Sequence, residues 1–316
     1  MNLLLRTKWL PLAFLMFFSW AFIHPNLIYS ASFHGSSSYP SFYTVVWLSD
    51  TQYYSEKYPH IFHKQIDWMI NEREKWNIQY VIHTGDIVNR AEKNEQWLVA
   101  DSVFAKLDQA NIPYGVLAGN HDLTYGVFYQ KYWQYFGQDR FQKKPYYGGS
   151  FQNNRGHYDL ITIGNRSFLF LYLGWGIDKE GISWMNQVLR LYPDRTAIIA
   201  THKYLHKSGK RTFIGNRIFQ KVVKKNQNVK MVLCGHYDNS QMVKTEIDDD
   251  HDGKPDRTVY EILADYQGGP NGGNGFLRLL HFYPDASKIF VRAYSPYTDQ
   301  FYYFPREKEE FWIDYE

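Results

Sequence analysis

Polar clusters in this chain carry the residue types that bind divalent metal ions. Each cluster contains Asp, Asn or His and directly follows a short apolar run. The clusters occupy residues 49–52, 85–89, 119–122, 201–202 and 235–238. A short β-branched run followed by Gly and polar residues indicates a buried strand that presents side chains at its carboxyl end. Open α/β sheets bind ligands at that edge, so we expect the clusters to come together there.

The side chains in these clusters form a set of oxygen and nitrogen ligands. The set comprises Asp50, Asp86, Asn120, His202 and His236. If the strands converge, Asp50 and Asp86 lie close together, and their repulsion calls for a cation or a proton. Two divalent ions about 4 Å apart, with one carboxylate between them, would relieve that charge. Asp86 is the candidate for the bridging carboxylate.

The elements that position these clusters follow from the hydrophobic pattern. Strands are predicted at 43–48, 80–83 and 114–117, with helices at 61–76 and 95–109 between them. This β-α-β order implies right-handed parallel crossovers. We expect a short helix at 128–136, a loop at 145–156, a hairpin of 157–163 and 167–173, helices at 182–192 and 216–225, and strands at 196–200 and 230–234. Alternation in the tail predicts strands at 241–247, 258–263, 276–282, 288–294 and 301–304. The fold class is therefore mixed α/β with an increasingly antiparallel second half.

The first 32 residues differ from the rest of the chain. Arg6 and Lys8 precede an apolar stretch at 9–23, and small residues follow at 30–32. This order is typical of a secretory signal. We expect a signal peptide at 1–32, a single domain at 33–316, and a secreted protein without a membrane span after cleavage. The alternative is an uncleaved anchor that holds the domain outside the cytoplasm, but the stretch is short for a span of about 20 residues.

Charge and cysteine content limit the choice of partners. The chain has 35 Lys and Arg against 32 Asp and Glu, and two of the basic residues lie in the first 32 positions. Net charge therefore predicts no specific binding to nucleic acid. Cys234 is the only cysteine, so no intrachain disulfide can form. It lies in an apolar run, which favours a buried hydrophobic residue over a nucleophile.

The ordered clusters resemble the calcineurin-like metallophosphoesterase family. The family pattern is D-x-H, G-D-x-x-N/D, G-N-H-D/E, a lone His and G-H-x-H, and the resemblance runs from Tyr43 to Asp238. One cluster alone is a weak signal, but all of them in order form a specific one. The resemblance implies a four-layer α-β-β-α sandwich of two mixed sheets flanked by helices.

By this resemblance, one metal ion is held by four residues: Asp86, Asn120, His202 and His236. The other is held by Asp50, Asp86, Gln52 and Asp238. Gln52 stands where D-x-H has its His, and Asp238 stands where G-H-x-H has its second His. Both changes replace nitrogen by oxygen on the same ion, which favours harder ions over zinc. We expect two divalent ions among Mn, Mg, Fe and Zn, with manganese favoured. Alternatively, Asp238 points away and this ion binds weakly.

The resemblance also implies a mechanism. A hydroxide that bridges the two ions attacks phosphorus, and His121 is the general acid for the leaving oxygen. Asn89 orients His121 through its amide oxygen. The implied activity is hydrolysis of a small-molecule phosphate ester, with a phosphodiester or nucleotide-type substrate favoured. The alternatives are a phosphomonoesterase or protein phosphatase, and a catalytically weak binding protein on the same fold. Taken singly, each of these residues could instead be a turn residue, a cap or a buried His.

Two weaker signals lie in the second half of the chain. Residues 248–253 have the D-x-D-x-D-G spacing of a calcium loop, with candidate ligands Asp248, Asp250, Asp252 and Asp256. Val259 replaces the bidentate Glu of that motif, so an acidic hairpin turn is the alternative to structural calcium. The Gly-rich segment 264–275 offers Gln267, Asn271 and Asn274 to phosphate or sugar, or is a loop without substrate contact.

Overall fold

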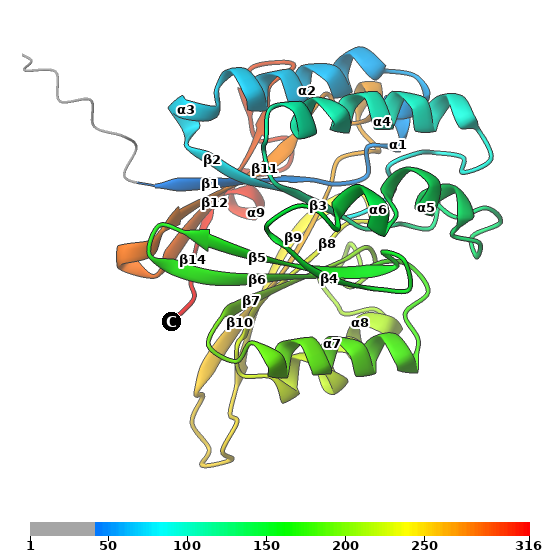
Figure 1. The fold of residues 1–316 in the computed structure, drawn as a ribbon. Helices are drawn as coiled ribbons and strands as arrows, with labels where there is room; N and C mark the ends of the chain where they lie inside the picture. The colour runs from blue at the N-terminus through cyan, green and yellow to red at the C-terminus, as the bar shows by residue number, and fades with distance from the viewer. Residues whose placement is uncertain (1–41) are drawn as a thin grey trace, which may run out of the picture. The chain divides into compact units, whose positions relative to one another are not determined.

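The computed structural model describes residues 42–316, so the expected signal peptide at 1–32 lies outside the described residues. Two seven-stranded sheets form the centre of this part (Figure 1). The first sheet has the order β13 (Gln300–Phe301), β12 (Lys288–Ser295), β11 (Leu277–Tyr283), β1 (Tyr43–Leu48), β2 (Ile78–His83) and β3 (Tyr114–Val116), and β14 (Phe311–Asp314) pairs with β12. The second has the order β4 (Tyr147–Phe151), β5 (Gly156–Ile163), β6 (Arg166–Leu173), β7 (Thr196–Thr201), β8 (Val229–Cys234), β10 (Arg257–Asp265) and β9 (Asn239–Ile247).

Helices cover the outer face of each sheet. The first sheet carries α1 (Gln52–Glu56), α2 (Pro59–Asn71), α3 (Arg73–Trp76), α4 (Asn94–Gln109), α5 (Gln130–Phe136) and α6 (Gln138–Phe141). The second carries α7 (Lys179–Leu191) and α8 (Phe213–Lys221), and α9 (Arg306–Glu309) lies in the tail. Figure 1 shows α2 and α4 on one side and α7 and α8 on the other, with both sheets between them. The predicted four-layer α-β-β-α sandwich is therefore confirmed.

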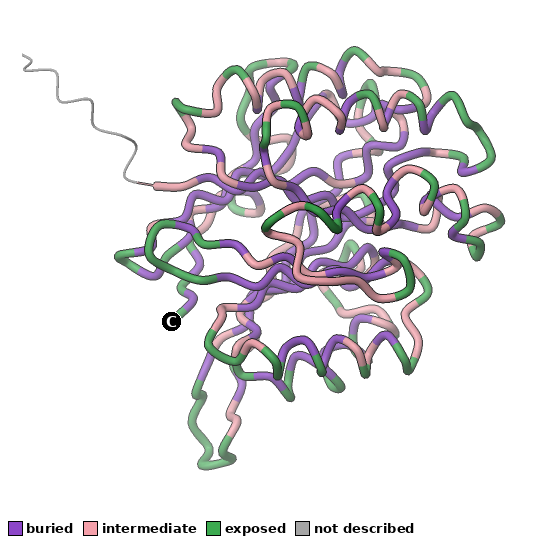
Figure 2. The backbone as a smooth tube through the Cα atoms, viewed as in Figure 1, coloured by how far each residue is buried: buried purple, intermediate pink, exposed green. Residues whose placement is uncertain are grey.

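Three apolar cores hold these layers together. One lies between the first sheet and its helices and includes Phe104 of α4 and Val81 of β2. Another lies between the sheets and includes Trp47, Phe170 and Leu280. The third lies between the second sheet and α7 and α8. Buried positions concentrate along these interfaces in Figure 2. Burial of apolar area in this arrangement is the main force that fixes the sheets against each other.

The parallel crossovers predicted from the β-α-β order are present. β1, β2 and β3 pair in parallel, as do β6, β7, β8 and β10. All five strands that precede the polar clusters therefore run in parallel ladders and end where the clusters begin. Within residues 42–316, no helix is both long and apolar enough to cross a membrane.

Local differences from the predicted elements have local causes. The helix predicted at 61–76 is divided because Glu72, at φ −100° and ψ 9°, leaves the helical conformation. α7 begins before the predicted residue 182 because the Asp178 side chain caps it, accepting a bond of 2.8 Å from Gly181 N–H. β4 lies within the loop predicted at 145–156; a Cβ on Gly148 would meet the Tyr158 ring of β5 at 2.1 Å, so the two strands approach this closely because Gly148 has no side chain. The strand predicted at 301–304 covers only Gln300–Phe301, and β14 was not predicted.

A buried ion pair ties the tail to both sheets. Arg278 of β11 and Glu309 of α9 are both fully buried, and Arg278 donates to the Glu309 carbonyl at 2.9 Å and to the Ser240 hydroxyl of β9. The Glu309 carboxylate accepts bonds from Tyr303 N–H at 2.6 Å and Phe304 N–H at 3.0 Å. Removing one partner of such a pair leaves the other charge buried and uncompensated.

Glu309→Ala is therefore expected to lower the free energy of unfolding by about 3 kcal/mol, measured by urea denaturation. Glu307→Ala is the matched control, because Glu307 is exposed in the same short helix. It should change the free energy of unfolding by less than about 0.5 kcal/mol. Equal losses in the two variants would show that the buried pair does not stabilise the tail.

Candidate metal centre

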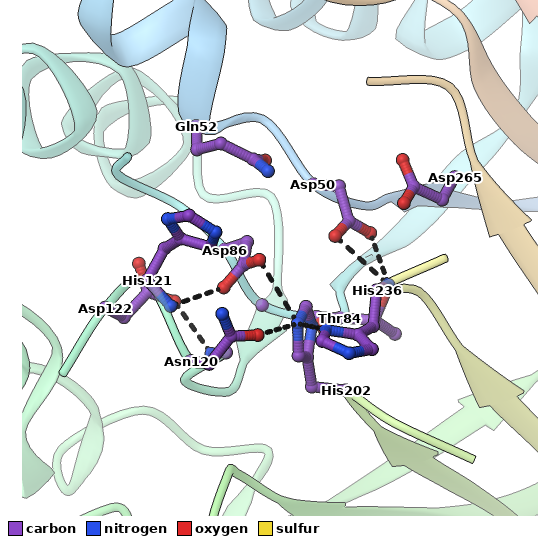
Figure 3. A network of polar contacts seen from close by, with 12 residues as sticks. Asp50, Gln52, Thr84, Asp86, Asn120, His121, Asp122, His202, His236 and Asp265 are labelled. Carbon is purple, nitrogen blue, oxygen red and sulfur yellow. Dashed lines mark hydrogen bonds and ion pairs between the residues drawn. The ribbon is translucent and has the colours of Figure 1, made fainter. Parts of the chain in front are cut away.

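The ends of five parallel strands bring the polar clusters to one place, as the sequence predicted. Figure 3 shows Asp50, Asp86, Asn120, His202 and His236 around a common point. Three of these residues have left-handed backbone conformations, with φ of 53° at Asp50, 54° at Asp86 and 76° at His236. Such conformations are costly for residues other than Gly and concentrate at functional sites.

His202 Nε2 lies at the centre of the cluster. It is 3.2 Å from Asp86 Oδ2, 3.2 Å from Asn120 Oδ1 and 3.2 Å from His236 Nδ1. On the other side of the ring, Nδ1 lies 2.9 Å from the Thr84 carbonyl. A carbonyl can only accept, so the Nδ1 proton is donated to Thr84, and Nε2 faces the cluster with a lone pair whenever His202 is neutral. Electron-rich atoms from four side chains therefore face one another, and this donor set fits a metal ion.

The pKa values of His202 and His236 also indicate that this site favours one positive charge. Burial opposes a charge on His202, but the Asp86 and Asp50 carboxylates outweigh it and raise the pKa of His202 to about 10. Burial and the neighbouring His202 charge lower the pKa of His236 to about 3. In the metal-free chain, one proton at His202 therefore takes the place that a cation would fill.

A second group of carboxylates lies on the Asp50 side. Asp50 is buried, and its carboxylate accepts from the Ser49 hydroxyl and, at 3.1 Å, from His236 N–H. Burial and the charge of Asp265 raise the pKa of Asp50 well above its ordinary value. Asp265 is also buried, and burial raises its pKa to about 7. This side of the site also has an excess of negative charge.

Asp265 was not predicted as a site residue. It ends β10, directly after Leu263 and Ala264, at the start of the Gly-rich segment 264–275. An apolar run followed by Asp and Gly is the pattern of the other clusters, so the sequence held the signal. Its carboxylate accepts from Gln267 N–H at 2.9 Å and from Gln267 Nε2 at 2.7 Å.

The two residues that depart from the family pattern lie in different surroundings. Gln52 is buried and donates from Nε2 to Gln267, and its Oε1 accepts no hydrogen bond from the described residues. That free acceptor is available to an ion. Asp238 is exposed and accepts a bond of 3.2 Å from Gly268 N–H. The structure therefore brings Gln52 to the edge of the cluster, whereas Asp238, between β8 and β9, is hydrogen-bonded to the Gly-rich segment.

Asn89 contacts His121, as predicted, but through its backbone carbonyl and not through its side chain. Its backbone N–H donates to Asp86 Oδ1 at 2.9 Å, and its Nδ1 lies 2.8 Å from the Asn89 backbone carbonyl. The predicted partner was the Asn89 side-chain amide. The Asn89 side chain instead hydrogen-bonds the Glu56 carboxylate. Burial raises the pKa of Glu56, but the Asn89 bond and the neighbouring cations outweigh burial and lower it below its ordinary value. The orientation of His121 therefore depends on the backbone at position 89, which is a correction to the prediction.

Asp122 joins the second and third clusters without facing the ligands. Its carboxylate accepts from Ile87 N–H at 2.8 Å, Val88 N–H at 2.9 Å and Gly119 N–H at 2.8 Å. Burial and the charge of Asp86 raise its pKa to about 8, although these bonds act in the opposite direction. Asp122 thus sets the distance between the loops that carry Asp86 and Asn120.

Two glycines allow the loops to approach. A Cβ on Gly119 would meet Asp86 Oδ1 at 2.1 Å, and one on Gly235 would meet Asp50 Oδ2 at 2.0 Å. Because these contacts are far below van der Waals distance, a side chain at either position would displace a ligand. Glycine is required at both positions by close packing.

The acidic loop lies at the tip of the β9–β10 hairpin. Asp248, Asp250 and Asp252 offer oxygens within 4.8 Å of one another. Asp256 instead accepts a bond of 2.7 Å from Asp249 N–H. In the Gly-rich segment, Asn271 donates to Asn274 at 2.9 Å. Structural calcium in this loop stays a prediction.

Comparison with known proteins identifies a family to which this chain is similar. A family model described as calcineurin-like phosphoesterase matches residues 43–237. The uncharacterized protein YvnB of Bacillus subtilis (strain 168) is 55% identical over 263 residues, which cover 83% of this chain and 20% of that protein. A probable cyclic nucleotide phosphodiesterase of Moraxella catarrhalis (strain BBH18) is 29% identical over 163 residues, 48% of this chain and 56% of that protein. The chain thus spans about a fifth of one curated relative and about half of the other.

Solved structures show the same fold. Purple acid phosphatase PPD1 from yellow lupin (Lupinus luteus) seeds superposes with a TM-score of 0.59 at 15% identity, covering 87% of this chain and 55% of that chain. GAP50, the anchor in the inner membrane complex of Plasmodium, gives 0.52 at 12% identity, covering 84% of this chain and 88% of that chain. At these identities the likeness concerns the arrangement of the elements.

Asp122→Ala is expected to lower the free energy of unfolding by about 3 kcal/mol, because it leaves buried N–H groups without acceptors. Urea denaturation would measure this loss. Asp139→Ala is the control, since Asp139 is exposed and bonds only the neighbouring Gln142 side chain. A loss no larger than that of the control would mean that Asp122 does not hold the two loops together.

Proposed function

The chain belongs to the calcineurin-like phosphoesterase family, a family of phosphoric ester hydrolases, and from this premise we propose that it hydrolyses phosphate esters at a dinuclear metal centre. The observation that carries the proposal is the convergence of Asp86, Asn120 and His236 on His202 Nε2, each at 3.2 Å. Without a metal ion this donor set is satisfied only when His202 carries a second proton, and a metal ion can take the place of that proton. We further propose that the substrate is a phosphodiester or a nucleotide-type ester.

In this proposal four residues would hold one ion: Asp86, Asn120, His202 and His236. Asp86, Asp50 and Gln52 would hold the other, and the charge of Asp265 beside Asp50 would favour a cation there. Asp238 would have to leave Gly268 to join them. The oxygen-rich second set favours manganese among the candidate ions. When bound, the two ions would neutralise phosphoryl oxygens and make a water molecule more acidic.

The chain itself supplies the proton for the leaving group. His121 Nδ1 donates to the Asn89 carbonyl, so Nε2 can give a proton to the leaving oxygen when His121 is in its doubly protonated, imidazolium form. In the hydrolysis, the oxygen of water bonds to phosphorus and the ester P–O bond breaks. The departing oxygen takes a proton from His121, and the proton of water passes to solvent. Positioned acids of this kind contribute about 10²- to 10⁴-fold to rate.

Two observations bear on the substrate and on the alternatives. The relative named as a probable cyclic nucleotide phosphodiesterase supports a diester over a monoester. The exposed position of Asp238 supports the other candidate, a catalytically weak binding protein, because it leaves the second ion with fewer ligands.

Metal content should distinguish these readings. After manganese loading, elemental analysis is expected to find two ions per chain in the wild type and one in Asp50→Asn, because Asp50 serves only the second ion. His236→Ala should lose the other ion. One ion in the wild type, unchanged by Asp50→Asn, would contradict the dinuclear centre and favour the binding protein.

Activity should depend on His121 and Asp86. The manganese-loaded protein is expected to hydrolyse bis-p-nitrophenyl phosphate faster than p-nitrophenyl phosphate. His121→Ala and Asp86→Asn should each lower kcat by at least about 100-fold. His60→Ala is the control, because His60 is an exposed histidine that contacts the Tyr58 and Tyr297 rings. Full activity in His121→Ala would refute its role as the acid, and preference for the monoester would favour a phosphomonoesterase.

A further inference from the structure

A cavity of about 680 Å³ opens beside the candidate metal centre. Most of its wall is apolar, and its large side chains are Trp175, Ile177, Phe213, Ile214 and Tyr237. The Trp175 ring lies 5.9 Å from the His202 ring and 5.3 Å from the His236 ring, and the Tyr237 ring lies 4.5 Å from His236. The cavity wall is therefore formed in part by residues that contact or adjoin the metal ligands His202 and His236, so the cavity lies next to the metal centre.

A cation stands where the cavity meets the ligands. Lys203 directly follows His202, and its Nζ lies 5.5 Å from the Trp175 ring centre and 5.4 Å from the Tyr237 ring centre. Aromatic faces on both sides hold an ammonium group in place. Across residues 42–316, Lys203 forms no salt bridge. It is therefore free to bind an anion.

Arg211, which also lines the cavity, is neutralised by a different partner. Its guanidinium donates to the buried carboxylate of Glu261 at 2.5 Å and packs on the Phe219 ring, 3.5 Å from the ring centre. Of these two cations, only Lys203 lies next to a metal ligand with its charge uncompensated. The cavity is also lined by His206 and Lys210, but Lys203 is the cation that directly follows a metal ligand in the chain.

Phe213 presents an apolar ring at the cavity. It is the first residue of α8 and is 88% exposed. Its backbone is fixed, because the Thr212 side chain caps the helix and accepts a bond of 3.1 Å from Gly215 N–H. Folding leaves this ring in water although the backbone beneath it is held, so the ring is available to a ligand.

We propose that this cavity binds the retained ester arm of a phosphodiester and that the arm is a bulky apolar or aromatic group. The inference rests on the proposed function and names the substrate class of the same site. Lys203 contacts a non-bridging phosphoryl oxygen, and the arm packs between Trp175, Phe213 and the neighbouring apolar side chains. A cavity of this size is typical of sites for drug-sized ligands, so a methyl-sized arm would leave most of it unfilled.

Two substrates with one leaving group test the arm. Methyl p-nitrophenyl phosphate and phenyl p-nitrophenyl phosphate both lose p-nitrophenol when water replaces it on phosphorus, and only the retained arm differs. With the manganese-loaded full chain, kcat/KM should be at least about tenfold higher for the phenyl ester. Equal kcat/KM for the two esters would overturn the proposal.

Variants assign the effect to the cavity. Phe213→Ala is expected to lower kcat/KM about fivefold for the phenyl ester, through the lost apolar contact, and less than twofold for the methyl ester. Lys203→Met keeps the stem between the rings but removes the charge, so both esters should slow by the same factor, about tenfold or more. Leu191→Ala, at an exposed apolar residue of α7 outside the cavity, should change neither. A Phe213→Ala loss that is equal for both esters would also overturn the proposal.

A binding measurement separates this proposal from the proposed function. Calorimetric titration of the manganese-loaded protein with phenylphosphonate and methylphosphonate needs no turnover. Tighter binding of phenylphosphonate, lost in Phe213→Ala, supports the cavity as the arm site even if every ester resists hydrolysis and the proposed function fails. Equal binding of the two phosphonates, together with normal hydrolysis of both esters, would refute the arm site and leave the proposed function intact.

Discussion

The structure depends on one electrostatic constraint: buried groups that repel one another are held together at the ends of parallel strands. Asp86, Asn120 and His236 all approach the lone pair of His202 Nε2, and Asp50 and Asp265 add further buried negative charge beside them. Like charges and lone pairs at such distances in a protein interior destabilise the folded chain unless positive charge compensates them. The raised pKa of His202 shows that a proton can compensate part of this charge. Divalent ions compensate this charge more completely, which explains why carboxylates, an amide and imidazoles are gathered at this site.

The surrounding fold keeps these groups from moving apart. Asp50, Asp86 and His236 adopt left-handed backbone conformations, and a Cβ at Gly119 or Gly235 would collide with a ligand carboxylate. Asp122 fixes two of the loops through backbone N–H groups, and the Thr84 carbonyl fixes the His202 ring. The sheets are in turn fixed by apolar packing between them and under their helices. Local strain in the loops therefore persists because the burial of both sheets stabilises the chain as a whole.

Much of this arrangement could be predicted from the sequence, and the rest could not for identifiable reasons. Apolar runs followed by polar clusters predicted the parallel strands that carry Asp50, Asp86, Asn120, His202 and His236, because strand direction determines where their carboxyl ends meet. Which atom of a residue makes a contact depends on loop conformation, so the partner of His121 was assigned to the Asn89 amide although it is the Asn89 carbonyl. Asp265 follows an apolar run as the other clusters do, but it matches none of the five motifs, so it was not predicted; the parallel pairing of β10 with β8 brings it to the site. The hydrogen bond from Gly268 N–H to Asp238 is a tertiary contact that no local pattern reveals.

The proposed role of the cavity in binding the substrate depends on metal ions being bound at the neighbouring centre. Anomalous diffraction from crystals of the manganese-loaded protein, recorded at the manganese absorption edge, tests the metal centre most directly. We expect two neighbouring peaks that share Asp86 as a ligand. One should be bound by His202 Nε2 and His236 Nδ1, and the other should lie beside Asp50 and Gln52. The absence of any peak among these residues, with His202 Nε2 bonded only to protein atoms, would contradict the metal centre.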